Sequence, residues 1–287
     1  MKNLHLIFPR VHYRGIISVL CIQILFLLQT EAQVALKAPT VKSEFQEYFE
    51  KCGVTGTILI FDETKKSYFT NDLSAIDEIS LPASSFKIIN LLIALETKVI
   101  ADESEVIKWP GTTDTTLYGY RPDIYKDMSV REAFQASAGW AFMEIAKKVG
   151  KSTYHQYLAK AGYGNGKVFA ESDDFWNFGE FGVTPLQQMD LIRRLYYDQL
   201  PFSKRNMAIV KQVMKDEITP SYSIHAKTGW TRDNGINTGW WVGYIEKENG
   251  PCFFVTRLLQ DRKYNRKDFG SCRKTITKRI LEDLKVI

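Results

Sequence analysis

Apolar and polar positions alternate in two regions of the chain, one near its start and one near its end, and such alternation predicts β-strands. In the first region, two segments are separated by a polar turn that contains Lys65 and Lys66. In the last region, Asn249-Gly250 lies between two segments and is typical of a tight hairpin turn. The predicted strands cover residues 53–62, 67–70, 223–230, 239–246 and 252–259.

The remaining segments mostly carry apolar residues three and four apart, which predicts helices. Ser129 with Glu132 forms a capping box, and Thr184 precedes a proline at a first helical position. The predicted helices cover residues 41–50, 84–98, 129–136, 140–149, 152–161, 184–198, 203–214 and 271–284. Residues 99–127 are rich in Asp, Gly, Thr and Tyr and are predicted to form a surface loop. This order of elements predicts an α+β fold, an antiparallel sheet flanked by helices with an inserted helical subdomain.

The N-terminus has the composition of a secretory signal peptide. Basic residues precede an apolar run over 15–28, and small and polar residues follow it up to Ala32. The run is short for a membrane span, although an uncleaved anchor is the alternative. We therefore expect a signal peptide over 1–32, a catalytic domain over 33–287, export to the periplasm and no stable membrane anchor. The domain has ordinary globular composition, with 45% hydrophobic and 25% charged residues in the whole chain.

Charge and cysteine content exclude several classes of site. The chain carries a net charge of +5 and has no run of five or six basic residues, so nucleic acid is not an expected partner. Three cysteines remain after the signal peptide, Cys52, Cys252 and Cys272; export permits a disulfide, but the pairing stays open. No cysteine has a histidine or another cysteine at metal-ligand spacing, so no metal site is predicted. With four scattered histidines, a serine nucleophile would need another base.

The tetrad Ser84-Ser85-Phe86-Lys87 provides such a pair. Serine and lysine three residues apart lie on one face of a helix, and the residues after Lys87 are almost all apolar. Burial lowers the pKa of a lysine and makes it a candidate base for the serine hydroxyl. A capping serine followed by a lysine that extends to solvent would give the same letters. The same spacing recurs at Ser271 and Lys274 in a charged segment, so the tetrad alone decides nothing.

Two further segments could complete a site around this serine. Lys227-Thr228-Gly229-Trp230 lies on a predicted strand, where the lysine and the threonine could bind an anion and the glycine would allow close approach to the backbone. The N–H groups of Trp230 and Ser84 could then bind an oxyanion. An ordinary edge strand with a glycine bulge is the competing interpretation. Ser137-Ala138-Gly139 lies between two predicted helices, where a serine is most often a cap.

A loop contributes two aromatic motifs, Tyr163-Gly164-Asn165 and Phe175-Trp176. Such residues are common in turns, and Trp176 could belong to the core. Alternatively, its indole N–H could donate a hydrogen bond to the group at Lys87.

In this order the motifs, together with Trp240-Trp241-Val242-Gly243, resemble those of the class D β-lactamases, or oxacillinases. The resemblance extends from about Phe45 to the C-terminal helix. It implies hydrolysis of penicillins and oxacillin-type β-lactams, and thus antibiotic resistance, by a serine hydrolase. No cofactor is implied except carbon dioxide or bicarbonate, which would convert Lys87 to N6-carboxylysine.

The resemblance also implies individual roles. Ser84 would be the acylated nucleophile, the carboxylated Lys87 the general base, and Ser137 a proton relay to the leaving nitrogen. Trp176 would hydrogen-bond the lysine carbamate. The residues implied to bind the substrate carboxylate are Lys227, Thr228 and Arg273.

One position departs from the family pattern, because Gly139 stands where the family has a valine that covers the carboxylated lysine. The loss of that side chain could speed deacylation and widen the substrate range, or it could wet the lysine pocket and weaken the carbamate. The alternative function is a β-lactam sensor or penicillin-binding domain that stays acylated at Ser84. Sensors carry several membrane spans, whereas this chain has one short apolar stretch. A small D,D-peptidase is a third interpretation, and the oligomeric state stays open.

Overall fold

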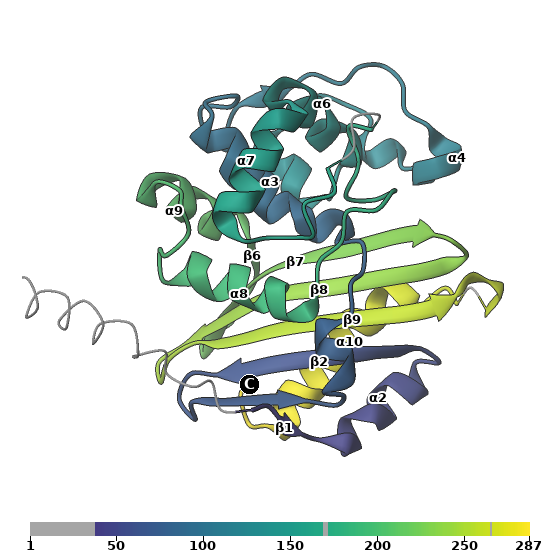
Figure 1. The fold of residues 1–287 in the computed structure, drawn as a ribbon, viewed down its shortest axis with the longest axis vertical. Coiled ribbons are helices and arrows are strands. Elements are labelled where there is room, and N and C mark those ends of the chain that lie inside the picture. The colour runs from purple at the N-terminus through teal and green to yellow at the C-terminus, as the bar shows by residue number, and fades with distance from the viewer. Residues whose placement is uncertain (1–37, 169–171, 265) are drawn as a thin grey trace, which may run out of the picture. The chain divides into compact units, whose positions relative to one another are not determined.

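A seven-stranded sheet runs through the computed structural model, which describes residues 38–168, 172–264 and 266–287. The strand order is β1-β3-β2-β9-β8-β7-β6 (Figure 1). All neighbours are antiparallel except β1 and β3. The five predicted strands are confirmed, and the short strands β1 and β6 are additions. The strands are β1 (Thr40–Val41), β2 (Thr55–Asp62), β3 (Ser67–Thr70), β6 (Lys215–Ile218), β7 (Tyr222–Asp233), β8 (Ile236–Lys247) and β9 (Cys252–Asp261).

Helices cover both faces of this sheet (Figure 1). Helices α2 and α10 pack together on one face, and α8 packs against β8 and β9 from the other. The longer helices confirm the predicted segments within a few residues, and both predicted helix starts, at Ser129 and Thr184, form capping boxes. The helices are α2 (Gln46–Lys51), α3 (Lys87–Glu96), α4 (Thr115–Tyr118), α5 (Val130–Gln135), α6 (Gly139–Val149), α7 (Lys151–Ala161), α8 (Pro185–Tyr196), α9 (Lys204–Val213) and α10 (Phe269–Asp283).

The region predicted as one surface loop, 99–127, contains regular structure. It holds β4 (Val106–Ile107), the short helix α4 and a 3-10 turn at Pro122–Ile124, and β4 pairs with β5 (Met128–Ser129). None of these elements is long enough to show a periodic pattern, so the prediction of a plain loop was wrong in this respect.

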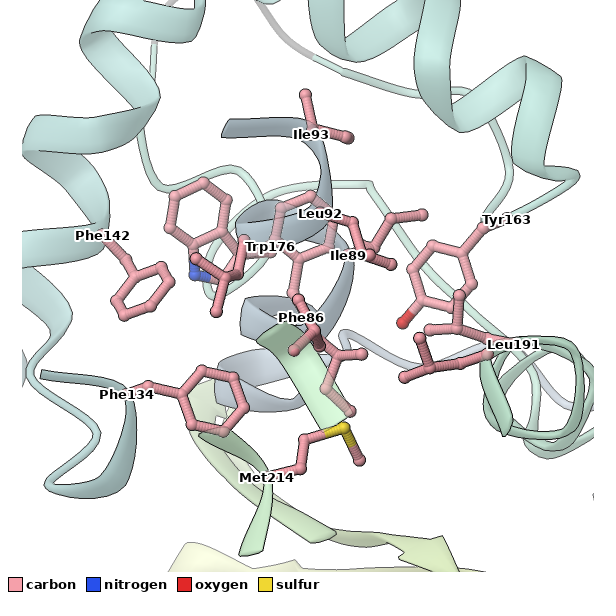
Figure 2. Packing of buried hydrophobic residues seen from close by; sticks show 14 of the residues in the cluster. Phe86, Ile89, Leu92, Ile93, Phe134, Phe142, Tyr163, Trp176, Leu191 and Met214 are labelled. Atoms are coloured by element: carbon pink, nitrogen blue, oxygen red, sulfur yellow. The ribbon is translucent and has the colours of Figure 1, made fainter. Parts of the chain in front are cut away.

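Helix α3 forms the centre of the larger hydrophobic cluster. Its residues from Lys87 to Leu95 are all buried, as an almost continuous apolar sequence requires. Figure 2 shows aromatic and aliphatic side chains from several elements around this helix. A 3-10 turn, η3 (Ala83–Phe86), leads into α3 and packs against β7 and β8. The core therefore fixes the Ser84 turn relative to the sheet.

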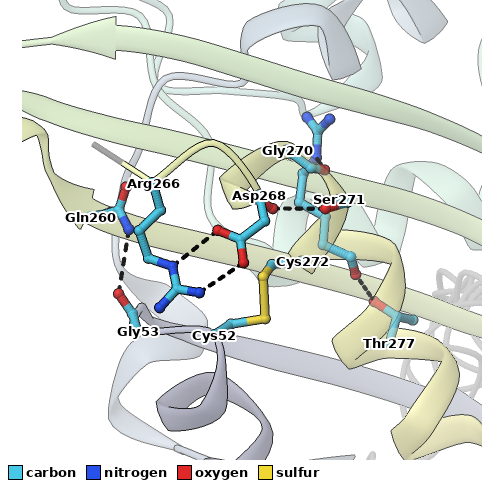
Figure 3. Close-up of a disulfide and its surroundings, with 10 residues drawn as sticks. Cys52, Gly53, Gln260, Arg266, Asp268, Gly270, Ser271, Cys272 and Thr277 are labelled. Carbon is cyan, nitrogen blue, oxygen red and sulfur yellow. Dashed lines mark hydrogen bonds and ion pairs between the residues drawn. A yellow bond between two sulfur atoms is a disulfide. The ribbon is translucent and has the colours of Figure 1, made fainter. Parts of the chain in front are cut away.

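A disulfide between Cys52 and Cys272 joins α2 to α10 and resolves the pairing that the sequence left open (Figure 3). Cys252 is a buried free thiol. Among the described residues, no cluster of three acidic, histidine or cysteine side chains could hold a metal ion. No described helix has the length and apolarity needed to cross a membrane. The predicted signal peptide lies outside the described residues, so the 1–32 and 33–287 boundaries stay predictions.

Candidate active site

Ser84 and Lys87 lie next to each other, as their spacing predicts. Ser84 belongs to η3, and the Lys87 Nζ donates to the Ser84 Oγ at 2.8 Å. Ala83 has a φ of 51°, a conformation that non-glycine residues rarely adopt and that is typical of strained functional turns. Lys87 has no exposed surface, and this burial lowers the pKa of its amine to about 8. The contact provides a serine with an amine that can lose its proton near neutral pH.

The walls around Lys87 are aromatic. Its Nζ lies 5.2 Å from the centre of the Phe142 ring, and Trp176 stacks on Phe86 with ring centres 4.9 Å apart. Figure 2 shows the Trp176 indole nitrogen on the side of its ring that faces Phe142. That N–H is buried and has no hydrogen-bond partner among the described residues. A buried donor without an acceptor is costly, so this donor leaves room for an acceptor that the described residues do not supply.

Ser137 and Lys227 form a second serine–lysine pair on the other side of the site. Ser137 lies between α5 and α6 with a φ of 59°, and its Oγ accepts a hydrogen bond of 3.0 Å from the Lys227 Nζ. The pKa of Lys227 is well below its usual value, first because of burial and then because of the nearby Lys87 and Arg273 charges. The buried amine of Lys227 on β7 thus contacts Ser137, which lies between two helices.

Gly229 lets β7 and η3 approach closely. A Cβ at this position would lie 2.8 Å from the Pro82 carbonyl oxygen and 3.0 Å from the Ser85 nitrogen. The sequence predicted that glycine would admit a ligand, whereas the group that fills this space is the backbone of the Ser84 turn. The β7–β8 register is continuous past Gly229, so the competing interpretation of a bulge is wrong. Trp230 follows directly and lines the same cleft as Ser84.

Arg273 enters the cleft from α10. Its guanidinium donates to the carbonyl oxygens of Gly229 and Gly270, and burial lowers its pKa to about 10, so it stays cationic at neutral pH. Arg273 lies within the second serine–lysine tetrad, but the serine and the lysine of that tetrad make their contacts outside the cleft. Ser271 donates to a backbone carbonyl, and Lys274 pairs with Asp216.

One cleft brings the predicted residues together. Its lining includes Ser84, Ser137, Thr228, Gly229, Trp230 and Arg273. Lys87 and Lys227 are buried and contact the lining residues Ser84 and Ser137, and Trp176 is buried as well. The pairing of β7 with β6 ends at His225, so the residues of β7 that border the cleft present an outer edge with no neighbouring strand in the described sheet. Backbone N–H groups on such an edge are available to a bound molecule.

Tyr163 supports the site through hydrogen bonds but does not line the cleft. The Tyr163 hydroxyl donates to the Gln188 side chain at 3.0 Å, and Gln188 donates to the Ser85 Oγ at 2.7 Å. Ser85 in turn donates to the Pro82 carbonyl. This chain of hydrogen bonds connects η3 to α8 through Gln188.

Sequence reasoning missed Asp174 and its partners. This carboxylate is buried and accepts hydrogen bonds from the Tyr118 hydroxyl at 2.6 Å and the Asn177 amide at 2.7 Å. Burial raises its pKa to about 6. An acid immediately before Phe175-Trp176 was visible in the sequence, but nothing there showed that it would be buried.

Gly139 faces Tyr118. A Cβ at Gly139 would have the Tyr118 ring as its nearest neighbour, at 4.0 Å. Trp140, the next residue, donates its indole N–H to the Ile124 carbonyl. The tyrosine from α4 therefore lies beside the position that lacks a side chain.

The comparisons with known proteins agree with this arrangement. Residues 54–282 match the family model described as penicillin binding protein transpeptidase domain. This match places the chain in the class of penicillin-recognising serine proteins.

Closer relatives define the family. The chain is 34% identical over 251 residues to β-lactamase OXA-10 of Pseudomonas aeruginosa, covering 86% of this chain and 91% of that protein. It is 32% identical to β-lactamase OXA-48 of Klebsiella pneumoniae, covering 87% and 93%. The crystal structure of a class D β-lactamase from Sebaldella termitidis superposes with a TM-score of 0.80 at 33% identity, covering 86% of this chain and 97% of the other. The class D enzyme YbXI from Nostoc superposes with a TM-score of 0.78 at 33% identity, covering 86% and 99%. The chain belongs to the class D β-lactamases and is a serine hydrolase.

Proposed function

We propose that the enzyme hydrolyses penicillins and oxacillin-type β-lactams through an acyl-enzyme at Ser84, with carboxylated Lys87 as the general base. The observation that carries the proposal is the 2.8 Å contact between the Lys87 Nζ and the Ser84 Oγ in a buried pocket. The unpartnered indole N–H of Trp176 supports the carboxylated form, because it can donate to a carbamate oxygen.

The pocket favours carboxylation of Lys87. Only a neutral amine attacks carbon dioxide, and a pKa of about 8 leaves a useful fraction of Lys87 neutral at pH 7. The amine forms a bond to carbon and releases a proton. A carbamate on Lys87 would supply an anionic oxygen base close to Ser84.

Acylation follows from the positions of the chain's own residues. The Ser84 hydroxyl loses its proton to the base as its oxygen attacks the β-lactam carbonyl carbon. The N–H groups of Ser84 and Trp230, held together by the close packing at Gly229, would stabilise the oxyanion. Ser137, in contact with the Lys227 amine at 3.0 Å, would pass a proton to the leaving nitrogen. The C–N bond of the lactam then breaks.

Three groups on β7 and α10 would bind the substrate carboxylate. Arg273 keeps its positive charge, Thr228 offers a hydroxyl at the cleft, and the Lys227 amine lies 3.5 Å from that hydroxyl. A bound carboxylate also favours protonation of Lys227, which would make this amine a proton source during acylation. The same base at Lys87 would then activate water to release the product.

A bicarbonate titration tests the proposal. The rate of hydrolysis of a chromogenic cephalosporin should rise with added bicarbonate, and [13C]bicarbonate should give a carbamate NMR signal that disappears in Lys87→Ala. Retained turnover in Lys87→Ala would rule out Lys87 as the base. A wild-type rate that is insensitive to bicarbonate, without a carbamate signal, would mean that Lys87 acts as a free amine.

Export to the periplasm, and with it a role in antibiotic resistance, is part of the proposal. The Cys52–Cys272 disulfide supports it, since disulfides persist in oxidising compartments. Cell fractionation of a host that expresses the full chain tests the location, with cytoplasmic activity as the contrary result. A raised minimal inhibitory concentration of penicillin in the same host tests resistance.

A further inference from the structure

The acid Asp174 is buried and bonded to two residues that line the active-site cleft. It is 3% exposed, although an isolated carboxylate in such a place is unfavourable. Both of its oxygens are occupied: the Tyr118 hydroxyl of α4 donates to one at 2.6 Å, and the Asn177 amide donates to the other at 2.7 Å. The same tyrosine and asparagine line the cleft that contains Ser84. The Asp174 carboxylate is therefore held by two residues that also line the cleft.

The segment that carries Asp174 is attached to the catalytic elements on both sides. Two residues on, the Trp176 carbonyl accepts a hydrogen bond of 3.0 Å from the Ala83 N–H, directly before Ser84. One residue further, the Asn177 carbonyl accepts a hydrogen bond of 2.5 Å from the Thr231 hydroxyl of β7. Asp174 thus has a fixed position relative to both the nucleophile turn and the edge strand.

Lys87 is the charged group whose field acts on the pKa of Asp174. The Asp174 charge opposes the effect of burial on the pKa of Lys87, and the Lys87 charge does the same for Asp174. The other titratable groups facing this pair are Lys227 of β7, which repels a protonated Lys87, and Tyr118 itself. Tyr154 of α7, which donates a hydrogen bond to Asn90 of α3, stays protonated because burial raises its pKa.

We propose that Asp174 is a positioning residue of this active site: clamped by Tyr118 and Asn177, it places a buried negative charge opposite Lys87 and thereby controls when Lys87 can act as the base. This inference rests on the proposed role of Lys87. The ionised carboxylate stabilises the protonated lysine, which cannot accept a proton from Ser84. It also repels an anionic carbamate on the same amine. Both effects disfavour the active form of Lys87, so removal of the Asp174 charge should increase the population of that form.

The direction of the expected pH shift follows from these two effects. In Asp174→Asn the side chain keeps its size and can still contact Tyr118, but the negative charge is gone. The pKa of Lys87 then falls further below its usual value, and the acid limb of the kcat/KM profile should move to lower pH by about one unit. The bicarbonate concentration for half-maximal activity should fall as well.

Asp173→Asn is the matched control. It removes the same charge from the neighbouring position, but this side chain is 39% exposed and lies 3.8 Å from Lys151. Its acid limb should coincide with that of the wild type. Tyr118→Phe is the second variant. It leaves the carboxylate in place but deletes the hydroxyl that favours the ionised form of Asp174, so the limb should shift in the same direction by less.

Different results would overturn the proposed role of Lys87 and the proposed role of Asp174. Turnover retained in Lys87→Ala would overturn the role of Lys87 and this inference with it. An inactive Lys87→Ala, combined with an acid limb that does not move in Asp174→Asn and Tyr118→Phe, would overturn only the role of Asp174. If Asp174→Asn does not fold, an acid limb of the kcat/KM profile that stays at its wild-type pH in Tyr118→Phe would by itself overturn the role of Asp174.

Discussion

Substitution of Gly229 by alanine tests whether the contact between β7 and η3 builds the oxyanion site. The added Cβ would lie 2.8 Å from the Pro82 oxygen and 3.0 Å from the Ser85 nitrogen, both backbone atoms of the Ser84 turn. Ordinary contact begins at 3.4 Å, so the strand and the turn must separate by about half an ångström. That shift would pull the N–H of Trp230 away from the N–H of Ser84.

The expected loss follows from the cost of misplacing an oxyanion donor. Complete removal of one donor costs about 100- to 1,000-fold in kcat, and a displacement of about 1 Å can cost 100-fold. We therefore expect kcat for a chromogenic cephalosporin to fall roughly 10- to 100-fold in Gly229→Ala, or about 1.4–2.7 kcal/mol of transition-state stabilisation. KM should change less, since the carboxylate-binding side chains remain. Stopped-flow kinetics separate the acylation rate from substrate binding.

Gly270→Ala is the control for this experiment. Gly270 lies in α10, and its added Cβ would meet the Trp230 ring at 3.4 Å, which is ordinary contact. Its activity should stay within about twofold of the wild type. A Gly229→Ala enzyme with wild-type kcat and an intact fold would refute the argument that this close approach positions the two donors.

Two other predictions concern the lysine pocket and the disulfide. In Trp176→Phe, loss of the buried indole donor should raise the bicarbonate concentration for half-maximal activity roughly 10- to 100-fold. Trp241→Phe should leave it unchanged, because this second unpartnered indole belongs to the separate core cluster around α10; equal effects would contradict the Trp176 assignment. The double variant Cys52→Ser/Cys272→Ser should lose about 2–5 kcal/mol of unfolding free energy in urea, since the bond closes a separation of 220 residues. Reducing agent should lower the stability of the wild type but not of this variant; the opposite pattern would argue against the disulfide.

The long elements of the fold were predictable because each carries its own signal. Helix α8 has a proline start and a capping box, and β9 has a turn before it and begins with four consecutive apolar residues. β7 and β8 extend further than predicted, to a turn at Asn234-Gly235. Most of the residues that were missed are polar and carry no apolar alternation: Arg232 is exposed, whereas Thr231 and Asn237 are buried. β6 was missed because a short, exposed edge strand with the sequence Lys-Asp-Glu-Ile has no buried face.

The site was predictable where chemistry depends on local spacing. Ser84 and Lys87 are one turn apart, so their contact follows from a helix alone. Arg273 could be placed only through the family resemblance, since no local pattern links α10 to the cleft. Asp174 could not be found, because its burial depends on Tyr118, which is 56 residues away in the sequence. Long-range partners of this kind are set by the tertiary fold.

Intact-protein mass spectrometry during turnover tests the central claim most directly. Mixing the wild-type enzyme with a penicillin should give a transient adduct of one penicillin mass, mapped to the peptide that contains Ser84, which decays as product forms. Ser84→Ala should fold, show no adduct and hydrolyse nothing. Turnover in Ser84→Ala would contradict the nucleophile assignment. An adduct on wild-type enzyme that persists without product would identify a sensor instead of a hydrolase.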